Sequence, residues 1–372
     1  MFFVALAWGW RFAGPLGYDD PMRTFRPMPV LLLLLSLLSL SGCEEVGFYA
    51  QAARGQLGLI WDRQSIPALL QKPQTPARLR ARLQTVQDIR AFAGSQLGLP
   101  AAGDFGYYVE LGRPYPVWSV MASPELALTP YSWCYPLLGC LDYRGYFSQA
   151  GADALAGRLR SKGLEVAVSG ATTYSTLGHL NDPILSSFVY EPDADLAQLI
   201  FHELSHVLLF VPGDTVFNES FAVTVAAEGL QRFSKVHPLD LPARQAADAR
   251  ESQFVALVLR YRQQLQALYA SPLSVAEKRA EKQRIYAAMR QDYADHKQVW
   301  GGFAGYDRWM AHANNALLNG VATYYDDVPA LQALLASKQH DLPAFYAACR
   351  DLAKLTPEQR RAALQQQFKA GA

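Results

Sequence analysis

The sequence predicts a mostly helical α+β fold with a small β-sheet in its first half. Apolar residues recur at helical spacing within 51–97 and 253–369, the pattern of amphipathic helices. Short aromatic and β-branched runs, bounded by Gly and Pro, fall between 107 and 187, as in strands. The composition is 51% hydrophobic and 18% charged with a net charge of +1. It lacks the basic excess typical of nucleic-acid-binding proteins.

The N-terminus carries an export signal rather than part of the fold. Residues 30–40 form an apolar run behind Arg23 and Arg26, and this run has the length of a signal-peptide core. It is shorter than the roughly 20 residues of a membrane-spanning helix. The run ends Leu-Ser-Gly-Cys43, which is similar to a bacterial lipobox, where the Cys is acylated and becomes the first mature residue. A plain secretory signal or membrane anchor is the alternative.

The expected organisation follows from this signal. We predict a signal region over 1–42, a first part over 43–240 that holds the central motif, and a helical part over 241–372. Met22 gives a more usual signal start than Met1, so the printed start is expected to be over-extended. The expected location is the periplasm, with a lipid anchor at Cys43. Glu44 after that Cys favours the outer membrane in a bacterium with two membranes.

The elements of the first part follow from spacing and punctuation. In chain order, we expect helices within 51–97, a β-hairpin over 107–122, an ordered loop over 133–147, a helix over 152–162 and a strand over 164–168. Cys134 and Cys140 lie six residues apart in that loop, and an oxidising compartment favours a disulfide between them. Two buried thiols are the alternative.

Two helices are expected after short β-like runs over 173–178 and 182–187. The first covers 194–210 with Asp193 as its N-cap, and the second covers 218–233 after Pro212-Gly213-Asp214. The remaining chain predicts further helices over 253–270, 275–292, 306–318, 328–337, 342–355 and 357–369.

The first of these two helices carries His202-Glu203-Leu204-Ser205-His206. Residues four apart share a helix face, so both imidazoles can bind one metal. This is the HExxH pattern of zinc metallopeptidases, in which the Glu acts as general base. We therefore expect one Zn²⁺ held by His202 and His206, with Glu203 as the catalytic base.

A catalytic zinc usually has a third protein ligand and one open position. Glu219 and Glu228 both lie on the following helix, nine residues apart, which is about 900° of helical rotation and places them on opposite faces. A short antiparallel connection brings Glu219 beside His206, so Glu219 is the expected ligand. The alternative for Glu219 is an acid that complements the helix dipole. Glu228 is expected to support a ligand or to form an ion pair.

Several segments together resemble one family. They include Phe201–His206, Gly213–Ala222, Trp133-Cys134-Tyr135-Pro136, Tyr143–Phe147, Tyr174–Gly178, Asp182-Pro183 and Asn314-Asn315-Ala316. This set, spread over most of the mature chain, resembles the bacterial "putative (predicted) aminopeptidase" family. The resemblance implies a zincin-like fold and a gluzincin-type zinc site whose third ligand is the Glu of Asn-Glu-x-Phe-Ala, here Glu219. It also implies a lipoprotein-type export signal.

The predicted reaction is peptide hydrolysis by metal-activated water. Tyr174 and Tyr324 are the candidate donors for the oxyanion, and a substrate peptide is expected to pair with an exposed edge strand over 174–187. A buried hairpin is the alternative for that segment. The Gly-x-Met-Glu-Asn segment of the best-known gluzincin aminopeptidases is absent, so Asp182, Asp214 or Glu228 would hold a substrate amine. An envelope endopeptidase and a non-catalytic zinc-binding lipoprotein are the alternative functions.

Overall fold

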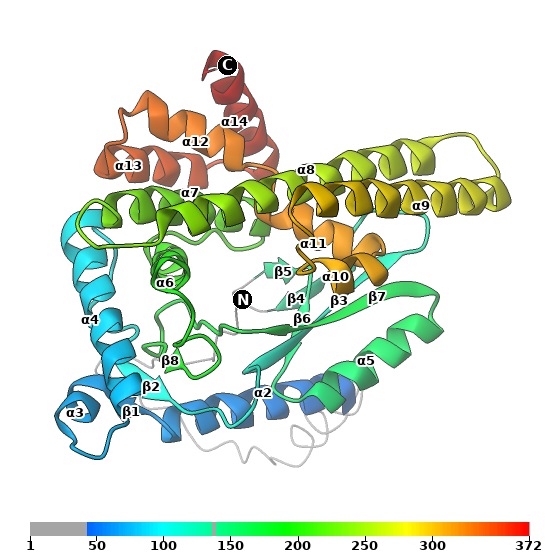
Figure 1. The fold of residues 1–372 in the computed structure, drawn as a ribbon. Helices are drawn as coiled ribbons and strands as arrows, with labels where there is room; N and C mark the ends of the chain where they lie inside the picture. Colours follow the sequence, from blue (N-terminus) through cyan, green and yellow to red (C-terminus); the bar gives the residue numbers. More distant parts are fainter. Residues whose placement is uncertain (1–42, 136–138, 372) are drawn as a thin grey trace, which may run out of the picture.

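The computed structural model describes residues 43–135 and 139–371. The predicted signal region over 1–42 lies outside the described residues. Helices α2 (Cys43–Trp61) and α5 (Gln149–Ser161) run along one side of the molecule (Figure 1). Helices α7 (Thr215–Phe233), α8 (Leu241–Ala270) and α9 (Val275–Val299) run along the opposite side, with the sheets between. No described helix is both long and apolar enough to cross a membrane.

The main sheet has three antiparallel strands in the order β6-β3-β7. Their bounds are Arg144–Tyr146 for β6, Val117–Pro124 for β3 and Leu164–Ala171 for β7. Side chains alternate between the faces of a strand, so Val120 and Ala122 of β3 pack with α5, whereas Met121 lies against Gly320 of α11 (Asn315–Tyr325). The sheet therefore lies between α5 on one face, with Phe48 of α2 packed beside it, and α11 on the other, and β7 is an outer strand.

The expected hairpin over 107–122 is wrong. Strand β2 (Tyr107–Val109) pairs with β1 (Gln64–Ser65) and β8 (Ile184–Leu185), not with β3. Pro114 and Pro116 stand between β2 and β3, and proline has no backbone N–H for a ladder. Another short pair, β4 (Trp133–Tyr135) and β5 (Gly139–Leu141), lies inside the segment expected to be an ordered loop.

The expected edge strand over 174–187 is also wrong. Most of this segment is turns and irregular backbone, and both residues of its short strand β8 are fully buried. Gly178, with φ of 76°, packs against Val207 so closely that a Cβ atom would lie 2.7 Å from that side chain. The segment therefore packs beside the helix that carries the HExxH motif and supports that helix.

That helix is α6 (Asp193–Leu208), and it packs against α7 and α4 (Ala77–Leu97). Asp193 is not the N-cap as expected: Pro192 holds that position, and Asp193 pairs with Arg82 of α4. Helix α7 starts three residues earlier than expected because Asp214 accepts a hydrogen bond from the backbone N–H of Phe217.

The expected helices of the last third are present in the structure. They are α8 and α9, α10 (Asp307–Ala311) and α11, α12 (Val328–Ser337), α13 (Leu342–Ala353) and α14 (Pro357–Gly371). The helix expected over 306–318 is two helices, because Asn314 adopts an extended backbone and caps α11 through the Leu317 N–H. The predicted division at 240/241 falls where α8 begins, and it stays a prediction.

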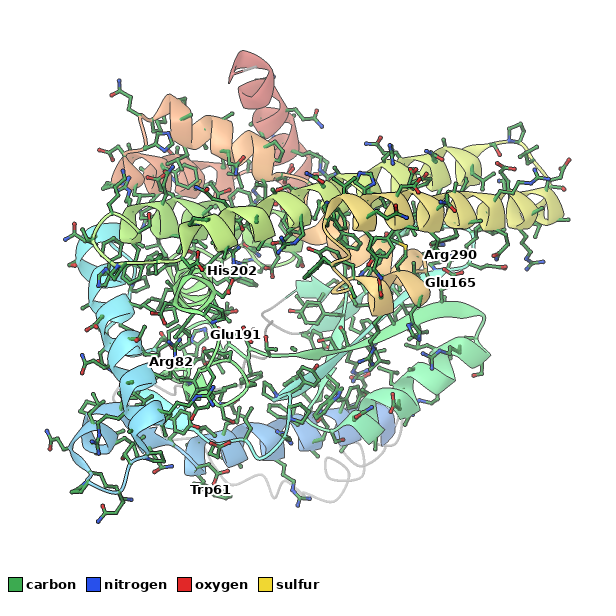
Figure 2. The ribbon with its side chains drawn as sticks, viewed as in Figure 1. Trp61, Arg82, Glu165, Glu191, His202 and Arg290 are labelled. Atoms are coloured by element: carbon green, nitrogen blue, oxygen red, sulfur yellow. A yellow bond between two sulfur atoms is a disulfide. The ribbon has the colours of Figure 1, made fainter. Side chains whose placement is uncertain are left out.

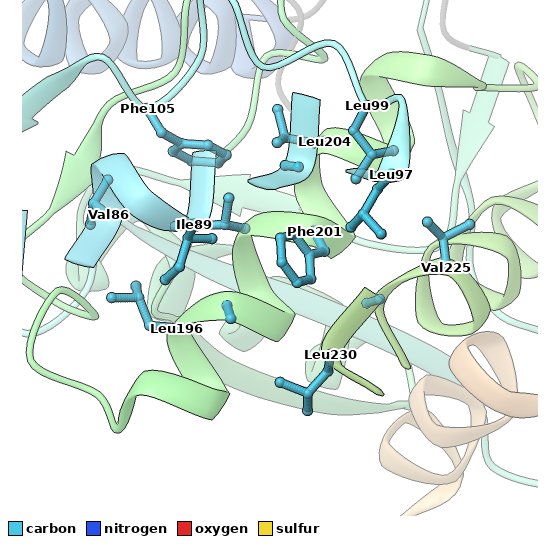
Figure 3. Packing of buried hydrophobic residues seen from close by; sticks show 14 of the residues in the cluster. Val86, Ile89, Leu97, Leu99, Phe105, Leu196, Phe201, Leu204, Val225 and Leu230 are labelled. Atoms are coloured by element: carbon cyan, nitrogen blue, oxygen red, sulfur yellow. The ribbon is translucent and has the colours of Figure 1, made fainter. Parts of the chain in front are cut away.

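The main core gathers where α4, α6 and α7 meet. Phe201 of α6 lies between Ile89 and Leu97 of α4 and the α7 residues Val225 and Leu230 (Figure 3). All five side chains are buried. This packing fixes the distance between α6 and α7, the two helices that carry the candidate ligands.

Gly229 lets α6 and α7 approach, and its replacement by Val should destabilise the protein. A Cβ atom there would lie 2.8 Å from both Leu97 and Phe201, and overpacking of this kind costs about 1–3 kcal/mol. The measurement is the free energy of unfolding in urea. Gly157→Val on α5 is the control, since a Cβ atom there meets nothing within 4 Å. Equal losses in the two variants would contradict this account of Gly229.

Candidate metal centre

Three potential ligand atoms converge between α6 and α7. His202 Nε2 lies 3.1 Å from His206 Nε2 and 3.2 Å from Glu219 Oε2, and His206 Nε2 lies 3.5 Å from the same oxygen. Among the described residues, these three form a group that can hold a metal ion. Figure 2 shows His202 on α6, next to α7. The structure thus brings together the three residues that the motif and the helix-face argument selected.

The spacing of these atoms fits zinc. Tetrahedral ligands with bonds of 2.0–2.1 Å are separated from one another by about 3.3 Å, and the three observed distances are 3.1, 3.2 and 3.5 Å. The side chains of His206 and Glu219 are buried, whereas that of His202 is 19% exposed. Of the three side chains, only that of His202 is partly open to solvent.

The charges of the group suit metal binding. Burial alone would raise the pKa of the Glu219 carboxyl, but the charges and hydrogen bonds of His206 and His202 outweigh it and hold that pKa well below its usual range. Burial lowers the pKa of the His206 imidazole, and Glu219 only partly offsets this. A carboxylate at Glu219 and a neutral imidazole at His206 are the protonation states that a metal requires of these two residues.

Glu203 lies next to His202 on the same helix and is 6% exposed. Its Oε2 atom is buried without a hydrogen-bond partner among the described residues. Such an atom is costly unless something else satisfies it. The Glu203 carboxylate therefore has one oxygen that the described residues leave open to another partner.

Sequence reasoning missed the residue that fixes the turn between α6 and α7. The Asn218 side chain is 2% exposed, accepts a hydrogen bond from Val211 N–H and donates one to Val211 C=O, both of 2.8 Å. This double contact closes the turn and sets the start of α7, and Glu219 is the next residue. An Asn directly before the expected ligand was the available signal.

The same turn is held from outside by two further parts of the chain. Asp214, the N-cap of α7, forms an ion pair with Arg360 of α14. Cys134 and Cys140 form a disulfide that joins β4 to β5. At the end of this loop, a Cβ atom at Gly139 would lie 2.9 Å from the backbone nitrogen of Gly213. The disulfide loop therefore packs directly on the connection between the two ligand-bearing helices.

Asp182, a candidate for holding a substrate amine, is instead engaged by its own loop. Its carboxylate accepts hydrogen bonds from the Ser175 hydroxyl and from the N–H and hydroxyl of Thr176. The side chain is 2% exposed. In this structure the carboxylate shapes the 175–182 turn beside α6 and does not face solvent.

Asp182 should make the stability depend on pH. Burial and the charge of Asp104 raise its pKa from 3.8 to about 6, although hydrogen bonds from Thr176 and Ser175 oppose the shift. Between these values the folded protein binds more protons than the unfolded chain, so stability falls as the pH rises through this window. A shift of this size corresponds to at most about 3 kcal/mol.

The comparison that tests this is between the wild type and Asp182→Asn. Unfolding free energies measured from pH 3.5 to 7 should show the wild type losing stability relative to the variant as the pH rises. A difference between the two proteins that stays constant over this range would contradict the assignment.

Glu228 faces away from the metal centre and forms ion pairs. Its carboxylate accepts from Arg232 Nε at 2.7 Å and lies 2.9 Å from Nδ1 of His340. Burial alone would raise its pKa, but these two partners lower it below the usual range. The contacts match the ion-pair role expected for Glu228 and leave its role in substrate binding a prediction.

The two candidate oxyanion donors lie in different parts of the fold. Tyr174 is 4% exposed, and its ring lies 5.2 Å from that of Phe147. Burial raises its pKa well above the usual value, so the phenol keeps its proton. Tyr324 belongs to α11, and its side chain lies outside what the structure describes. Cys43, the predicted lipid-attachment residue, is the first residue of α2, and its side chain is likewise outside the description.

Comparison with known proteins gave one match. The model of a family described as "Putative aminopeptidase" matches residues 47–364, which is most of the 372-residue chain. Neither the curated proteins nor the solved structures gave a match.

Proposed function

The chain belongs to the putative aminopeptidase family, and from this we propose that it is a zinc-dependent peptidase with a zincin-like fold. The observation that carries the metal dependence is the convergence of His202, His206 and Glu219 at tetrahedral spacing between two packed helices. One Zn²⁺ in a gluzincin-type site is the cofactor that these ligands fit.

When bound there, zinc supplies a Lewis acid that acidifies water and polarises a carbonyl group. Glu203 takes the proton of the attacking water and passes it to the leaving amine. Its buried Oε2 atom supports this role. Tyr174 or Tyr324 donates a hydrogen bond to the developing oxyanion in this proposal.

The substrate is a peptide or protein, bound in an extended form. Strand β7 is an outer strand of the main sheet and pairs only with β3 among the described strands. An extended peptide can add a strand to such an edge. The C=O of Val166 on β7 accepts a hydrogen bond from Asn314 Nδ2, which shows that this strand has a carbonyl that an amide donor can reach. We therefore assign peptide pairing to β7, in place of residues 174–187.

An endopeptidase is the second candidate. An aminopeptidase needs an acid that faces the substrate's ammonium group, and Asp182, Asp214 and Glu228 are all engaged by partners within the fold. A non-catalytic zinc protein is less well supported, because structural zinc usually has four protein ligands, and the group of described residues has three.

Peptides of one sequence with free and acetylated N-termini distinguish the two activities. An aminopeptidase releases the first residue of the free peptide only and leaves the acetylated peptide intact. An endopeptidase cleaves both at the same internal bond. Mass spectrometry of the products identifies the bond, and the metal chelator 1,10-phenanthroline should stop either reaction. Cleavage that persists after verified removal of zinc would refute the metal dependence.

We further propose that the protein is a lipoprotein of the bacterial envelope, anchored through Cys43 with its body in the periplasm. The lipobox-like Leu-Ser-Gly-Cys43 and the apolar run before it support this location, as does the disulfide between Cys134 and Cys140. Incorporation of labelled palmitate into the wild type but not into Cys43→Ser tests the anchor. Equal labelling of the two proteins would refute it.

A further inference from the structure

Helix α2 has two apolar faces, and one of them is exposed. Phe48 and Leu59 on the inner face are buried, whereas the outer face presents Val46, Tyr49, Leu57 and Trp61, which are 51%, 42%, 45% and 79% exposed. Ala50 and Ala53 are exposed between them. We call these six residues the outer stripe of α2. At 100° per residue the stripe spans about 120° of the helix surface over four turns.

A surface helix ordinarily has a polar outer face. The outer stripe has no charged member, and the charged residues Glu45 and Arg54 lie at its two borders. Four large apolar side chains in helical register differ from the single exposed apolar residues that any protein surface carries, and they indicate a site of contact. Figure 2 shows Trp61 on the outer side of α2, away from the rest of the molecule.

We propose that the outer stripe of α2 docks on the lipid bilayer, with the helix lying parallel to the membrane surface. This inference rests on the proposed envelope location. Helix α2 begins at Cys43, and only two residues separate that Cys from the end of the apolar run over 30–40. Whether acyl chains on Cys43 or the uncleaved run enters the membrane, the first turn of α2 is held at the surface.

The chemistry of the stripe fits an interface between lipid and water. Leu57 and Val46 supply apolar area, and Tyr49 and Trp61 each have an apolar ring with a polar atom, the kind of side chain enriched at membrane surfaces. The near absence of charge predicts docking on neutral lipids that depends little on salt.

Docking through α2 would also orient the molecule. Helices α7, α8 and α9 lie on the side opposite α2 (Figure 1). They would face away from the membrane, and the metal centre between α6 and α7 would stand off the lipid surface, open to substrates in the periplasm.

The test places an environment-sensitive fluorophore at single cysteines in the full chain, expressed and recovered in membranes. Trp61→Cys and Leu57→Cys probe the stripe, and Val299→Cys on α9, which is 82% exposed, is the matched control. The label reaches only the introduced thiol when Cys43 is acylated, because Cys134 and Cys140 form a disulfide and Cys349 is buried. Quenching is measured with nitroxides in phosphatidylcholine acyl chains and with iodide in the buffer.

Docking predicts that lipid nitroxides quench labels at 57 and 61 several-fold more than the label at 299, with iodide showing the reverse order. Equal iodide quenching at 61 and 299 in membrane-bound protein would overturn the docking while leaving the anchor intact. Protection of position 61 from both quenchers would overturn it too, since a protein segment would then cover the stripe. Absence of the wild type from membranes would instead show that the proposed envelope location has failed, and the inference with it.

Discussion

Glu203→Gln is expected to lower kcat by about 10²–10⁴-fold, the usual contribution of a positioned general base, and to leave one zinc per chain. Gln has nearly the same shape as Glu but cannot take a proton at neutral pH. The side chain is buried beside His202, and its Oε2 atom has no hydrogen-bond partner among the described residues. The substitution therefore removes the proton acceptor without removing a metal ligand or a packing contact.

Three measurements on purified protein establish this result. Initial rates on a cleaved peptide give kcat and KM, elemental analysis gives zinc content, and urea unfolding gives stability. Glu281→Gln makes the same chemical change on the surface of α9, where Glu281 pairs with Arg284, and should leave all three unchanged. Full activity in Glu203→Gln would show that another group accepts the proton. Loss of zinc together with activity would make Glu203 a residue that supports the metal instead.

The metal centre was predictable because it depends on local geometry. The four-residue spacing of His202 and His206 fixes their common helix face, and the short connection after α6 places the N-terminal part of α7, with Glu219 in its second turn, beside them. The helices of the last third were predictable for the same reason, since apolar periodicity is a local signal. Where the chain departed from that signal, as at Asn314, a side-chain cap interrupted the helix.

Contacts between distant parts of the chain could not be predicted from one sequence. Strand β2 pairs with β8 across more than seventy residues, and no local pattern distinguishes this pairing from a hairpin with β3. The acids near the motif were equally ambiguous. Asp214 is bound by Arg360 and Glu228 by His340, both more than a hundred residues away. The sequence alone therefore does not show whether a carboxylate can bind a substrate. Its partners in the folded protein must be known first.

Glu219→Ala is expected to reduce zinc affinity by more than about 100-fold, the upper end of what loss of a supporting residue costs. The variant loses one of three ligands and the only negative charge among them. His202 and His206 would then face a divalent cation with neutral imidazoles alone, 3.1 Å apart. Competition with a chromophoric chelator measures the affinity, and activity should recover partly when zinc is supplied in excess.

The control for this change lies on the same helix. Glu228→Ala removes a carboxylate of the same size from the opposite face of α7, where it pairs with Arg232 and His340, so it should lower stability without changing zinc affinity. Glu219→Ala should lower zinc affinity, and in zinc-free protein it should lower stability as well, because it removes one partner of a buried pair with His206. Zinc affinity is therefore the measurement that separates the two variants. Normal zinc affinity in Glu219→Ala would remove it from the metal centre. Reduced affinity in both variants would mean that the packing of α7, and not the ligand, determines metal binding.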